Sequence, residues 1–397
     1  MYVKRNIEDA ISMATANFPV VMLTGPRQVG KTTVIKNCDQ NRKYVTLDNL
    51  SDRKLAVEDP ELFLQKYQPP VLIDEVQYAP NLFSAIKVEV DQKQRNGMYW
   101  LTGSQQFHLM KNVSETLAER IAILQLQGFS QREKLHLNFA NVFTNTEEVL
   151  NQPPALVSLM SLYRAIWKGS CPKLACSPDE YWELYYNSYV QACIERYVRD
   201  FGLVSDELTF LKFMRALAAR TGQLLNLADV SKDVGVSAPT VKNWISVLRA
   251  SGIVYLLEPY YSNLTNRMTK MPKLYFLDTG LACYLTNWQT AETLESGAMS
   301  GAIFETYVVS EVLKSFWFCG KRAPLFFYRD KDKKEIDLLL EINGKLIPVE
   351  IKKKTSPDKN DIKNFDVIDY DQGFVVCLAS EYSFVSKKVR SIPVGYL

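Results

Sequence analysis

The sequence predicts an α/β fold in which a doubly wound parallel sheet is followed by a helical and winged-helix region and by a second α/β domain. Three observations predict this fold. Short apolar stretches alternate with helical patterns in the first quarter, a helix-turn-helix pattern starts near residue 226, and a hairpin signal follows a helical pattern near residue 343. We therefore expect four segments, at 1–133, 134–206, 207–290 and 297–397.

The amino-terminal sheet is expected from four short apolar stretches, each bounded by turn or charged residues. Helical patterns lie between them, at 31–38 and 81–93. Ligands of a parallel sheet bind at the carboxyl ends of its strands, so the residues that follow the stretches are candidates for a binding site. The four expected strands are Pro19–Thr24, Lys43–Leu47, Pro70–Ile73 and Tyr99–Thr102.

A phosphate-binding loop is predicted directly after the first strand, where GPRQVGKT matches the pattern G-x-x-x-x-G-K-[ST]. Its glycines let backbone N–H groups surround a phosphate at a helix N-terminus. Lys31 is expected to reach the β- and γ-phosphates of ATP, and the Thr32 hydroxyl to bind Mg²⁺. The expected nucleotide-binding residues are Gly25, Pro26, Arg27, Gln28, Val29, Gly30, Lys31, Thr32 and Thr33.

Polar residues also follow the third and fourth apolar stretches. Asp74 is expected to hold Mg²⁺ through water, and Glu75 to polarise the attacking water. After the fourth stretch, Ser104 and Gln105 are candidates to sense the γ-phosphate or orient water, with Thr102 next. A simple turn is the alternative interpretation of this last segment.

Five segments carry a family resemblance: GPRQVGKTT, LDN, LIDEVQYAP, LTGSQQ and LAERIAILQLQGFS. In order and spacing they resemble a large prokaryotic family of AAA-type P-loop ATPases, whose members carry a C-terminal domain of unknown function with a nuclease-like core. The resemblance implies ATP binding and hydrolysis by Lys31, Thr32, Asp74 and Glu75.

One position departs from the family pattern, because Glu119 stands where members usually have glycine. The following Arg120 matches the family. The resemblance implies that it contacts the γ-phosphate, either in its own chain or from a neighbouring subunit of a homo-oligomer. The alternative is a surface salt bridge with Glu115 or Glu119.

Residues 134–203 read as helical, with a loop at 168–179, and residues 226–252 read as a helix-turn-helix. Residues 253–257 and 273–277 supply strands for a wing, and the recognised family is similar here. The segment 208–275 contains nine Lys or Arg and three acids, a local excess of +6 that is typical of phosphate contact. DNA or RNA is therefore an expected partner, although few side chains are placed to read bases: Thr240, Lys242 and Asn243. The alternative is a winged helix that packs against protein.

A charged hairpin is predicted near the carboxyl end, where Asn343-Gly344 indicates a two-residue type I′ turn. If Ile342 pairs with Lys345, Asp337 falls opposite Glu350 and Glu335 falls opposite Lys352. These four residues then share one face, and apolar residues cover the other. Like charges that face each other destabilise a sheet, so this face needs a cation, either Lys352 or a metal.

Asp337, followed by Glu350-x-Lys352 on the next strand and preceded by Glu305 on a helix, resembles the PD-(D/E)xK nuclease arrangement. The resemblance implies a restriction-endonuclease-like domain in which Asp337, Glu350 and the auxiliary acid Glu305 bind Mg²⁺. Lys352 would be the catalytic lysine beside Glu350. Ile336 stands where the motif has proline. The alternatives are a solvated charged face and a nuclease fold that has lost activity.

Composition excludes several classes of protein. The formal net charge is 47 − 44 = +3, too small to predict nucleic-acid binding by the whole chain. No apolar run approaches the roughly 18 residues of a membrane helix, and the amino terminus lacks the apolar stretch of a signal peptide. Seven cysteines without a CxxC pair and two histidines argue against a disulfide framework and histidine-rich metal sites. We expect a cytoplasmic protein without membrane association.

Together these patterns predict an ATP-binding and ATP-hydrolysing protein whose nucleotide state controls a nucleic-acid-binding, nuclease-like carboxyl-terminal region. The alternative is a nucleotide-gated regulatory or binding module with a catalytically inactive nuclease fold.

Overall fold

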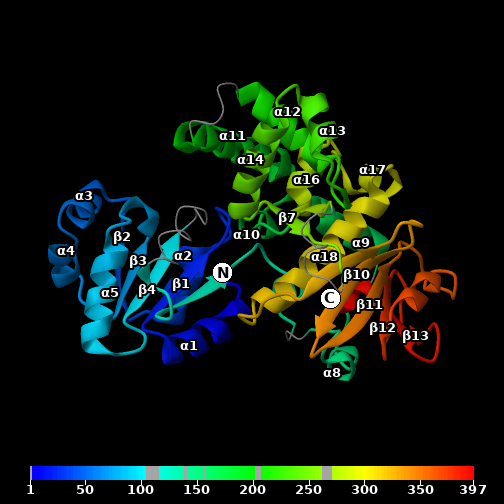
Figure 1. Ribbon diagram of the computed structural model, residues 1–397, viewed down its shortest axis with the longest axis horizontal. Helices are drawn as coiled ribbons and strands as arrows, with labels where there is room; N and C mark the ends of the chain where they lie inside the picture. Colours follow the sequence, from blue (N-terminus) through cyan, green and yellow to red (C-terminus); the bar gives the residue numbers. More distant parts are fainter. Residues whose placement is uncertain (1, 104–115, 138–140, 156–157, 202–206, 262–270) are drawn as a thin grey trace. The chain divides into compact units, whose positions relative to one another are not determined.

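The computed structural model describes residues 2–103, 116–137, 141–155, 158–201, 207–261 and 271–397 (Figure 1). The chain forms two compact units. The first contains the residues up to 129 together with 250–252 and 316–322, and the second contains the rest.

The first unit is built around a five-stranded parallel sheet, drawn in blue to cyan in Figure 1. Its strand order is β2-β3-β4-β1-β5, and every neighbouring pair is parallel, as the sequence predicts. The fifth strand, β5, is not among the predicted ones; like the predicted β2, it lies at an edge of the sheet and is partly exposed. The strands are β1 (Val20–Thr24), β2 (Lys43–Thr46), β3 (Val71–Asp74), β4 (Tyr99–Gly103) and β5 (Ile121–Gln125).

Helices cover both faces of this sheet. On one face, Phe83 and Ile86 of α5 belong to the same buried core as Met22 and Ile73 of the strands. On the other face, the Trp100 indole donates to a hydroxyl of α1 at 2.9 Å. This two-sided cover is the doubly wound arrangement that the sequence predicts. The helices are α1 (Ile7–Asn17), α2 (Lys31–Cys38), α3 (Leu50–Glu58), α4 (Pro60–Lys66), the 3-10 turn η1 (Val76–Tyr78) and α5 (Leu82–Lys93).

The second unit begins with helices, as predicted for this part of the chain. The predicted loop at 168–179 contains one short helix. The helices and 3-10 turns are α7 (Gln131–Lys134), α8 (Thr146–Leu150), α9 (Leu159–Lys168), α10 (Pro172–Ala175), η2 (Asp179–Tyr181), α11 (Trp182–Phe201) and α12 (Glu207–Ala218).

A helix-turn-helix and a small antiparallel sheet follow at the predicted positions. Gly235 ends α13 with a positive φ of 87°, and Trp244 of α14 packs its ring against Phe210 and Phe213 of α12. The sheet has the order β6-β8-β7. That this region is a winged helix stays a prediction. The elements are β6 (Gln223–Leu224), α13 (Leu227–Val234), α14 (Ala238–Ala250), β7 (Val254–Leu257) and β8 (Lys273–Phe276).

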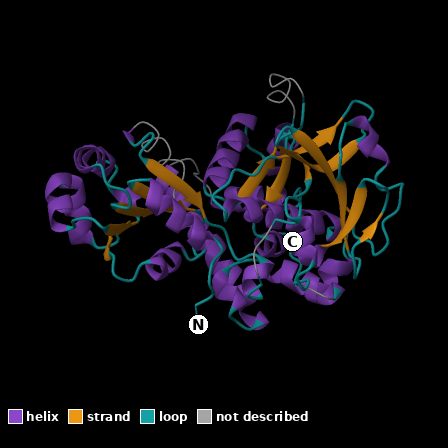
Figure 2. Ribbon diagram, turned by 90° about the horizontal axis from the view of Figure 1, so that it is seen from below, coloured by secondary structure: helices purple, strands orange, loops and turns teal. Residues whose placement is uncertain are grey.

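The carboxyl-terminal part holds a mixed six-stranded sheet of order β13-β14-β12-β11-β10-β9, whose strands are orange in Figure 2. It follows the predicted long helix, α18. The elements are α16 (Thr279–Leu285), α17 (Ala291–Ser296), α18 (Ser300–Trp317), β9 (Leu325–Arg329), β10 (Glu335–Ile342), β11 (Lys345–Ile351), η3 (Lys363–Val367), β12 (Gly373–Cys377), β13 (Ser383–Phe384), β14 (Val389–Pro393) and η4 (Val394–Tyr396).

The predicted hairpin joins β10 to β11. Asn343 and Gly344 have positive φ angles of 52° and 76°, the signature of a type I′ turn. Ile342 pairs with Lys345, and the ladder continues in the predicted register to Leu338 and Val349.

Across the described residues, no helix combines the length and the hydropathy needed to cross a membrane.

Candidate functional site

The phosphate-binding loop joins β1 to α2, at the carboxyl edge of the parallel sheet. Gly25 has a φ of 146°, and a Cβ atom on it would collide with the carbonyl oxygen of Leu126. Glycine is therefore needed there for both conformation and space. Gly30 precedes α2 with a φ of 89°, but a Cβ atom would meet nothing within 4 Å. The exposed side chains of the loop are those of Arg27 and Gln28.

Lys31 is buried at the start of α2, with 7% of its surface exposed. Its ammonium group donates to the carbonyl oxygens of Gly25 and Pro26, at 3.0 and 2.7 Å. The loop therefore folds around its own lysine, which places a positive charge at a helix N-terminus, where a phosphate group is favoured.

The carboxylate of Asp74 is the meeting point of the site. The hydroxyl of Thr32 lies 3.0 and 3.2 Å from its two oxygens, and the hydroxyl of Tyr44 donates to it at 3.0 Å. Thr102, at the end of β4, also donates its hydroxyl to Asp74. Burial and the neighbouring Asp74 raise the pKa of Tyr44 to about 12, so this hydroxyl keeps its proton at neutral pH. Two neighbouring strands and the helix after the loop thus converge on one acid at the end of β3.

These residues fit a magnesium–nucleotide complex. The Thr32 hydroxyl and the Asp74 carboxylate are hard oxygen donors of the kind that Mg²⁺ prefers. In the loop, Gly25 has no room for a side chain, and the buried Lys31 donates to the loop carbonyls. Tyr44 was not among the predicted site residues. Its position as a polar side chain in the second predicted strand was the only feature of the sequence that could have indicated this role.

The other predicted residues of this site occupy several positions. Glu75 directly follows β3 in a left-handed conformation with a φ of 58°, and the Gln77 amide donates to its carboxylate. Thr33 is exposed on the first turn of α2, and Val29 is buried. Ser104 and Gln105 lie outside the described residues.

Arg5 supports the loop from behind and was missed by the sequence analysis. Its guanidinium is 2% exposed and donates to the carbonyl oxygens of Val29, Gln127 and Gly128, at 3.0, 2.8 and 3.2 Å. It also lies over the ring of Phe129. Arg5 therefore connects the phosphate loop to the segment after β5. A lone arginine near the amino terminus gives no sequence signal for this role.

The predicted contact of Arg120 with the γ-phosphate of its own chain is wrong. Arg120 precedes β5, which runs parallel to β1, whereas the phosphate loop follows β1. Arg120 therefore lies at the amino ends of the strands and the phosphate loop at their carboxyl ends. The two are separated by the length of a five-residue strand, roughly 16 Å. The Arg120 guanidinium instead pairs with Asp91 of α5, at 2.5 and 3.1 Å, and not with the predicted Glu119. Glu115 lies outside the described residues. A contact with a neighbouring subunit stays a prediction.

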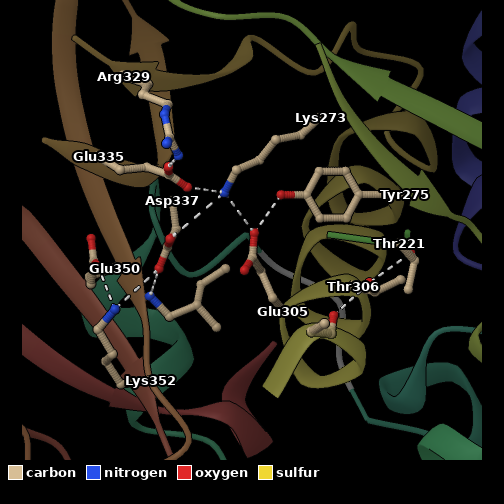
Figure 3. Close-up of polar contacts among 12 residues, drawn as sticks. Thr221, Lys273, Tyr275, Glu305, Thr306, Arg329, Glu335, Asp337, Glu350 and Lys352 are labelled. Atoms are coloured by element: carbon tan, nitrogen blue, oxygen red, sulfur yellow. Dashed lines mark hydrogen bonds and ion pairs between the residues drawn. The ribbon is translucent and has the colours of Figure 1, made fainter. Parts of the chain in front are cut away.

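A second polar cluster lies in the carboxyl-terminal part and brings together Glu305, Asp337, Glu350 and Lys352, as predicted (Figure 3). The Lys352 ammonium lies 2.6 Å from Glu350 and 3.7 Å from Asp337. A carboxylate oxygen of Asp337 also accepts a hydrogen bond from the backbone N–H of Ile351 at 2.9 Å. Burial, followed by the charge of Asp337, raises the pKa of Glu350 from 4.5 to about 8.

The two central acids of this charged face are buried, which disagrees with the alternative of a solvated face, while Glu335 and Lys352 are partly exposed. Asp337 and Glu350 are 8% and 5% exposed. Glu335 lies opposite Arg329 of β9 and pairs with its guanidinium, rather than with Lys352 as predicted. The β10–β11 pairing in the predicted register ends at Leu338 and Val349, one pair short of Asp337 and Glu350, and β10 also shifts register against β9 between Ile336 and Leu339.

The centre of the cluster is Lys273 of β8, which the sequence analysis did not place there. Its ammonium lies 2.6 Å from Glu335, 3.0 Å from Glu305 and 3.9 Å from Asp337 (Figure 3). The hydroxyl of Tyr275, two residues further along β8, donates to the same oxygen of Glu305 at 2.6 Å. Burial lowers the pKa of Lys273, but the three carboxylates outweigh burial and raise it overall.

The predicted metal site at Glu305, Asp337 and Glu350 does not fit this geometry. Within the ranges that the structure describes, no three acidic, histidine or cysteine side chains are arranged to hold a metal ion. Lys273 reaches two of the three predicted ligands, Glu305 and Asp337. A lysine ammonium therefore stands where the sequence analysis expected a divalent cation.

One of the basic residues counted around the helix-turn-helix is not at the surface, because Lys273 is buried. Arg220 pairs with Asp233, one of the three acids already counted. Lys242 and Asn243 are exposed on α14, and Thr240 is half-buried. Arg267 and Lys270, which were counted in that excess, lie outside the described residues.

Family models match three parts of the chain. Residues 17–135 match the AAA domain, 160–292 match a domain of unknown function (DUF8612), and 300–397 match a second domain of unknown function (DUF4143). The amino-terminal region is thus an AAA-type P-loop ATPase domain, which indicates ATP binding and hydrolysis, and the chain carries a carboxyl-terminal DUF4143 domain.

Similar proteins and solved structures include four that match much of the chain. Two uncharacterized proteins, of Mycobacterium tuberculosis and Mycobacterium bovis, are each 26% identical over 361 residues, which cover 89% of this chain and 75% of theirs. A Walker-type ATPase of Pyrococcus abyssi is 14% identical with a TM-score of 0.42, covering 70% of this chain and 94% of its own. A RuvB variant of Thermotoga maritima is 17% identical with a TM-score of 0.30, covering 63% and 88%.

Proposed function

We propose that this protein is a Mg²⁺-dependent ATPase whose nucleotide state controls its carboxyl-terminal unit. The single observation that carries the ATPase part is the hydrogen bond between Thr32 and Asp74, beside the buried ammonium of Lys31. Two oxygen donors and a lysine at one helix N-terminus are the set that binds a nucleoside triphosphate with its metal. The match of residues 17–135 to an AAA domain supports the same function.

Each residue has a proposed role in this reaction. Lys31 and the loop N–H groups bind the phosphates, and Thr32 and Asp74 would hold Mg²⁺. When bound, that ion neutralises charge on the phosphate oxygens. Glu75 orients and polarises the attacking water. Thr102 positions Asp74 through its hydroxyl.

For the carboxyl-terminal unit, a specific observation favours the nucleotide-gated binding module with an inactive nuclease fold. The position of Lys273 among the carboxylates removes the room that metal-dependent cleavage needs. The exposed side chains of Lys242 and Asn243 on α14 would contact a nucleic-acid backbone. In this proposal the nucleotide state of the first unit changes the affinity of the second unit for nucleic acid, and the second unit does not cleave it.

Steady-state ATP hydrolysis with Mg²⁺ tests the proposal. We expect Lys31→Ala to lower kcat/KM at least about 100-fold, since charge-stabilising groups of this kind contribute roughly 2.7–4 kcal/mol. Lys54→Ala, an exposed lysine on α3 of the same unit, is the matched control and should leave the rate unchanged. Equal rates for wild type and Lys31→Ala would remove the ATPase function.

Fluorescence anisotropy with labelled DNA and RNA oligonucleotides tests the second half. We expect affinity to depend on ATP and on salt, to fall in Lys242→Ala, and to persist without cleavage when Mg²⁺ is present. Cleavage that is lost in Asp337→Asn would contradict the inactive nuclease fold.

A further inference from the structure

Four elements of the second unit meet at the cluster: α18 contributes Glu305, the β10–β11 hairpin contributes further acids, β8 contributes Lys273 and β9 contributes Arg329 (Figure 3). Lys273 is the most enclosed member, because only 4% of its side chain is exposed. Lys352, the other lysine, keeps 35% of its side chain exposed. The two lysines are therefore not equivalent, since Lys273 is held inside the cluster and Lys352 at its border.

The charges of the cluster nearly balance without any ion from solution. Four carboxylates come together, and a buried carboxylate is costly unless a cation is paired with it. Lys273, Lys352 and Arg329 supply three positive charges at ion-pair distance. The acids that these cations contact are Glu305, Glu335, Asp337 and Glu350.

Space between the acids is as decisive as charge. A divalent metal binds carboxylate oxygens at about 2.0–2.6 Å. The Lys273 ammonium already lies 3.0 Å from Glu305 and 3.9 Å from Asp337, so an ion that joined these two acids would overlap it. Ammonium and metal therefore exclude each other at this position.

One oxygen of the cluster is still available for coordination. Oε2 of Glu350 is buried and has no hydrogen-bond partner within the described structure, although its other oxygen pairs with Lys352. A buried acceptor without a partner costs free energy. If the ammonium were removed, this oxygen would be ready to bind a cation.

We propose that Lys273 is the resident cation of this cluster, and that a divalent metal binds to Glu305, Asp337 and Glu350 only when the Lys273 ammonium is absent. The cluster is thus a carboxylate site that an internal lysine keeps closed to metal. This inference is independent of the ATPase function, because it concerns a different unit of the chain.

Mn²⁺ alone, titrated without nucleotide and counted by electron paramagnetic resonance, tests the inference in the full chain. Every protein carries Asp74→Asn, which silences the metal site of the ATPase unit. The key variant is Lys273→Met with Glu335→Gln, which removes the ammonium together with its nearest acid and so preserves the charge balance. We expect it to bind one more Mn²⁺ than the parent, at least tenfold tighter, and to lose that ion when Asp337→Asn is added.

The matched control is Lys352→Met, which removes the border lysine but keeps Lys273, and should gain no tight Mn²⁺ site. The inference is overturned if the folded key variant binds no additional ion, or if the parent itself binds Mn²⁺ tightly in a manner that Asp337→Asn abolishes. Because the parent folds with its native cluster, this last comparison decides the question even if the key variant does not fold. Circular dichroism establishes the folding of each protein.

Discussion

Thr32 and Asp74 lie 42 positions apart in the sequence and are joined by a hydrogen bond of 3.0 Å in the structure. The bond connects the first turn of α2 to the last residue of β3. It therefore fixes the relation between the loop that surrounds the phosphates and the acid that would hold the metal. Tyr44 and Thr102 hold the same acid from the neighbouring strands.

Removal of the Tyr44 hydroxyl should weaken metal use without loss of the fold. Tyr44→Phe deletes one hydrogen bond to Asp74, worth about 1.5–3 kcal/mol when the acceptor is charged, although Tyr44 is 39% exposed and solvent reduces this value. We expect the Mg²⁺ concentration for half-maximal ATP hydrolysis to rise about threefold to tenfold. Tyr67→Phe, which loses a similar bond to Asp52, should change nothing. An unchanged Mg²⁺ dependence in Tyr44→Phe would show that Asp74 does not need this hydroxyl.

The two glycines of the phosphate loop should differ in their tolerance of alanine. Gly25→Ala forces a side chain into the Leu126 carbonyl, so we expect the free energy of unfolding to fall by about 3–5 kcal/mol. Gly30→Ala carries conformational strain of about 1–2 kcal/mol but no collision. Urea unfolding of both variants measures the difference. Equal losses would contradict the steric explanation.

Arg5 should stabilise the first unit, because it holds the phosphate loop against the segment after β5. Arg5→Met leaves three carbonyl groups without their donor, and we expect the free energy of unfolding to fall by about 3 kcal/mol or more. Hydrogen–deuterium exchange should accelerate in the loop at 25–30 and after β5. The adjacent and exposed Lys4→Met is the control, and exchange there should match the wild type.

The first unit was predictable where a local pattern controls the structure. Four of the five strands, β1 to β4, follow from short apolar stretches, and the loop glycines follow from the phosphate pattern. Arg5 contacts the segment after β5, whereas Arg120 precedes β5. Neither placement was predicted, because β5 was not among the predicted strands.

Arg120→Ala should leave ATP hydrolysis unchanged in dilute protein, because its ion pair with Asp91 lies at the edge of the sheet away from the phosphate loop. A surface pair of this kind contributes little to stability. Hydrolysis rates per molecule, measured over a range of protein concentrations, check this. A loss confined to high concentration would place Arg120 at a neighbouring subunit, and a loss at every concentration would contradict its described position.

The stability of the second unit should depend on pH through Glu350. The folded chain keeps the proton of Glu350 up to about pH 8, whereas the unfolded chain releases it near pH 4.5. The folded state therefore binds more protons between these values, and the free energy of unfolding falls as pH rises. We expect this fall, measured by urea unfolding from pH 4.5 to 8, to be smaller in Glu350→Gln. Parallel pH profiles for the two proteins would refute the assignment.

In the second unit, the hairpin was predictable in detail, since Asn343-Gly344 sets the register of the pairs up to Leu338 and Val349. The partner of its acids was not. Lys273 lies 64 positions before Asp337, on a strand of a different sheet, and by charge alone it is one more basic residue near a helix-turn-helix. Charge counts do not reveal which cations are buried.

The position of Lys273 on β8 affects the design of truncated fragments of this protein. A fragment trimmed to 300–397, the stretch that matches DUF4143, inherits all four acids of the cluster but leaves their central ammonium behind. Such a fragment would fold with buried acidic side chains that lack the ammonium of Lys273 as their ion-pair partner. The boundary of the matched sequence family therefore differs from that of an independently folding domain. We expect a stable fragment to start before residue 273.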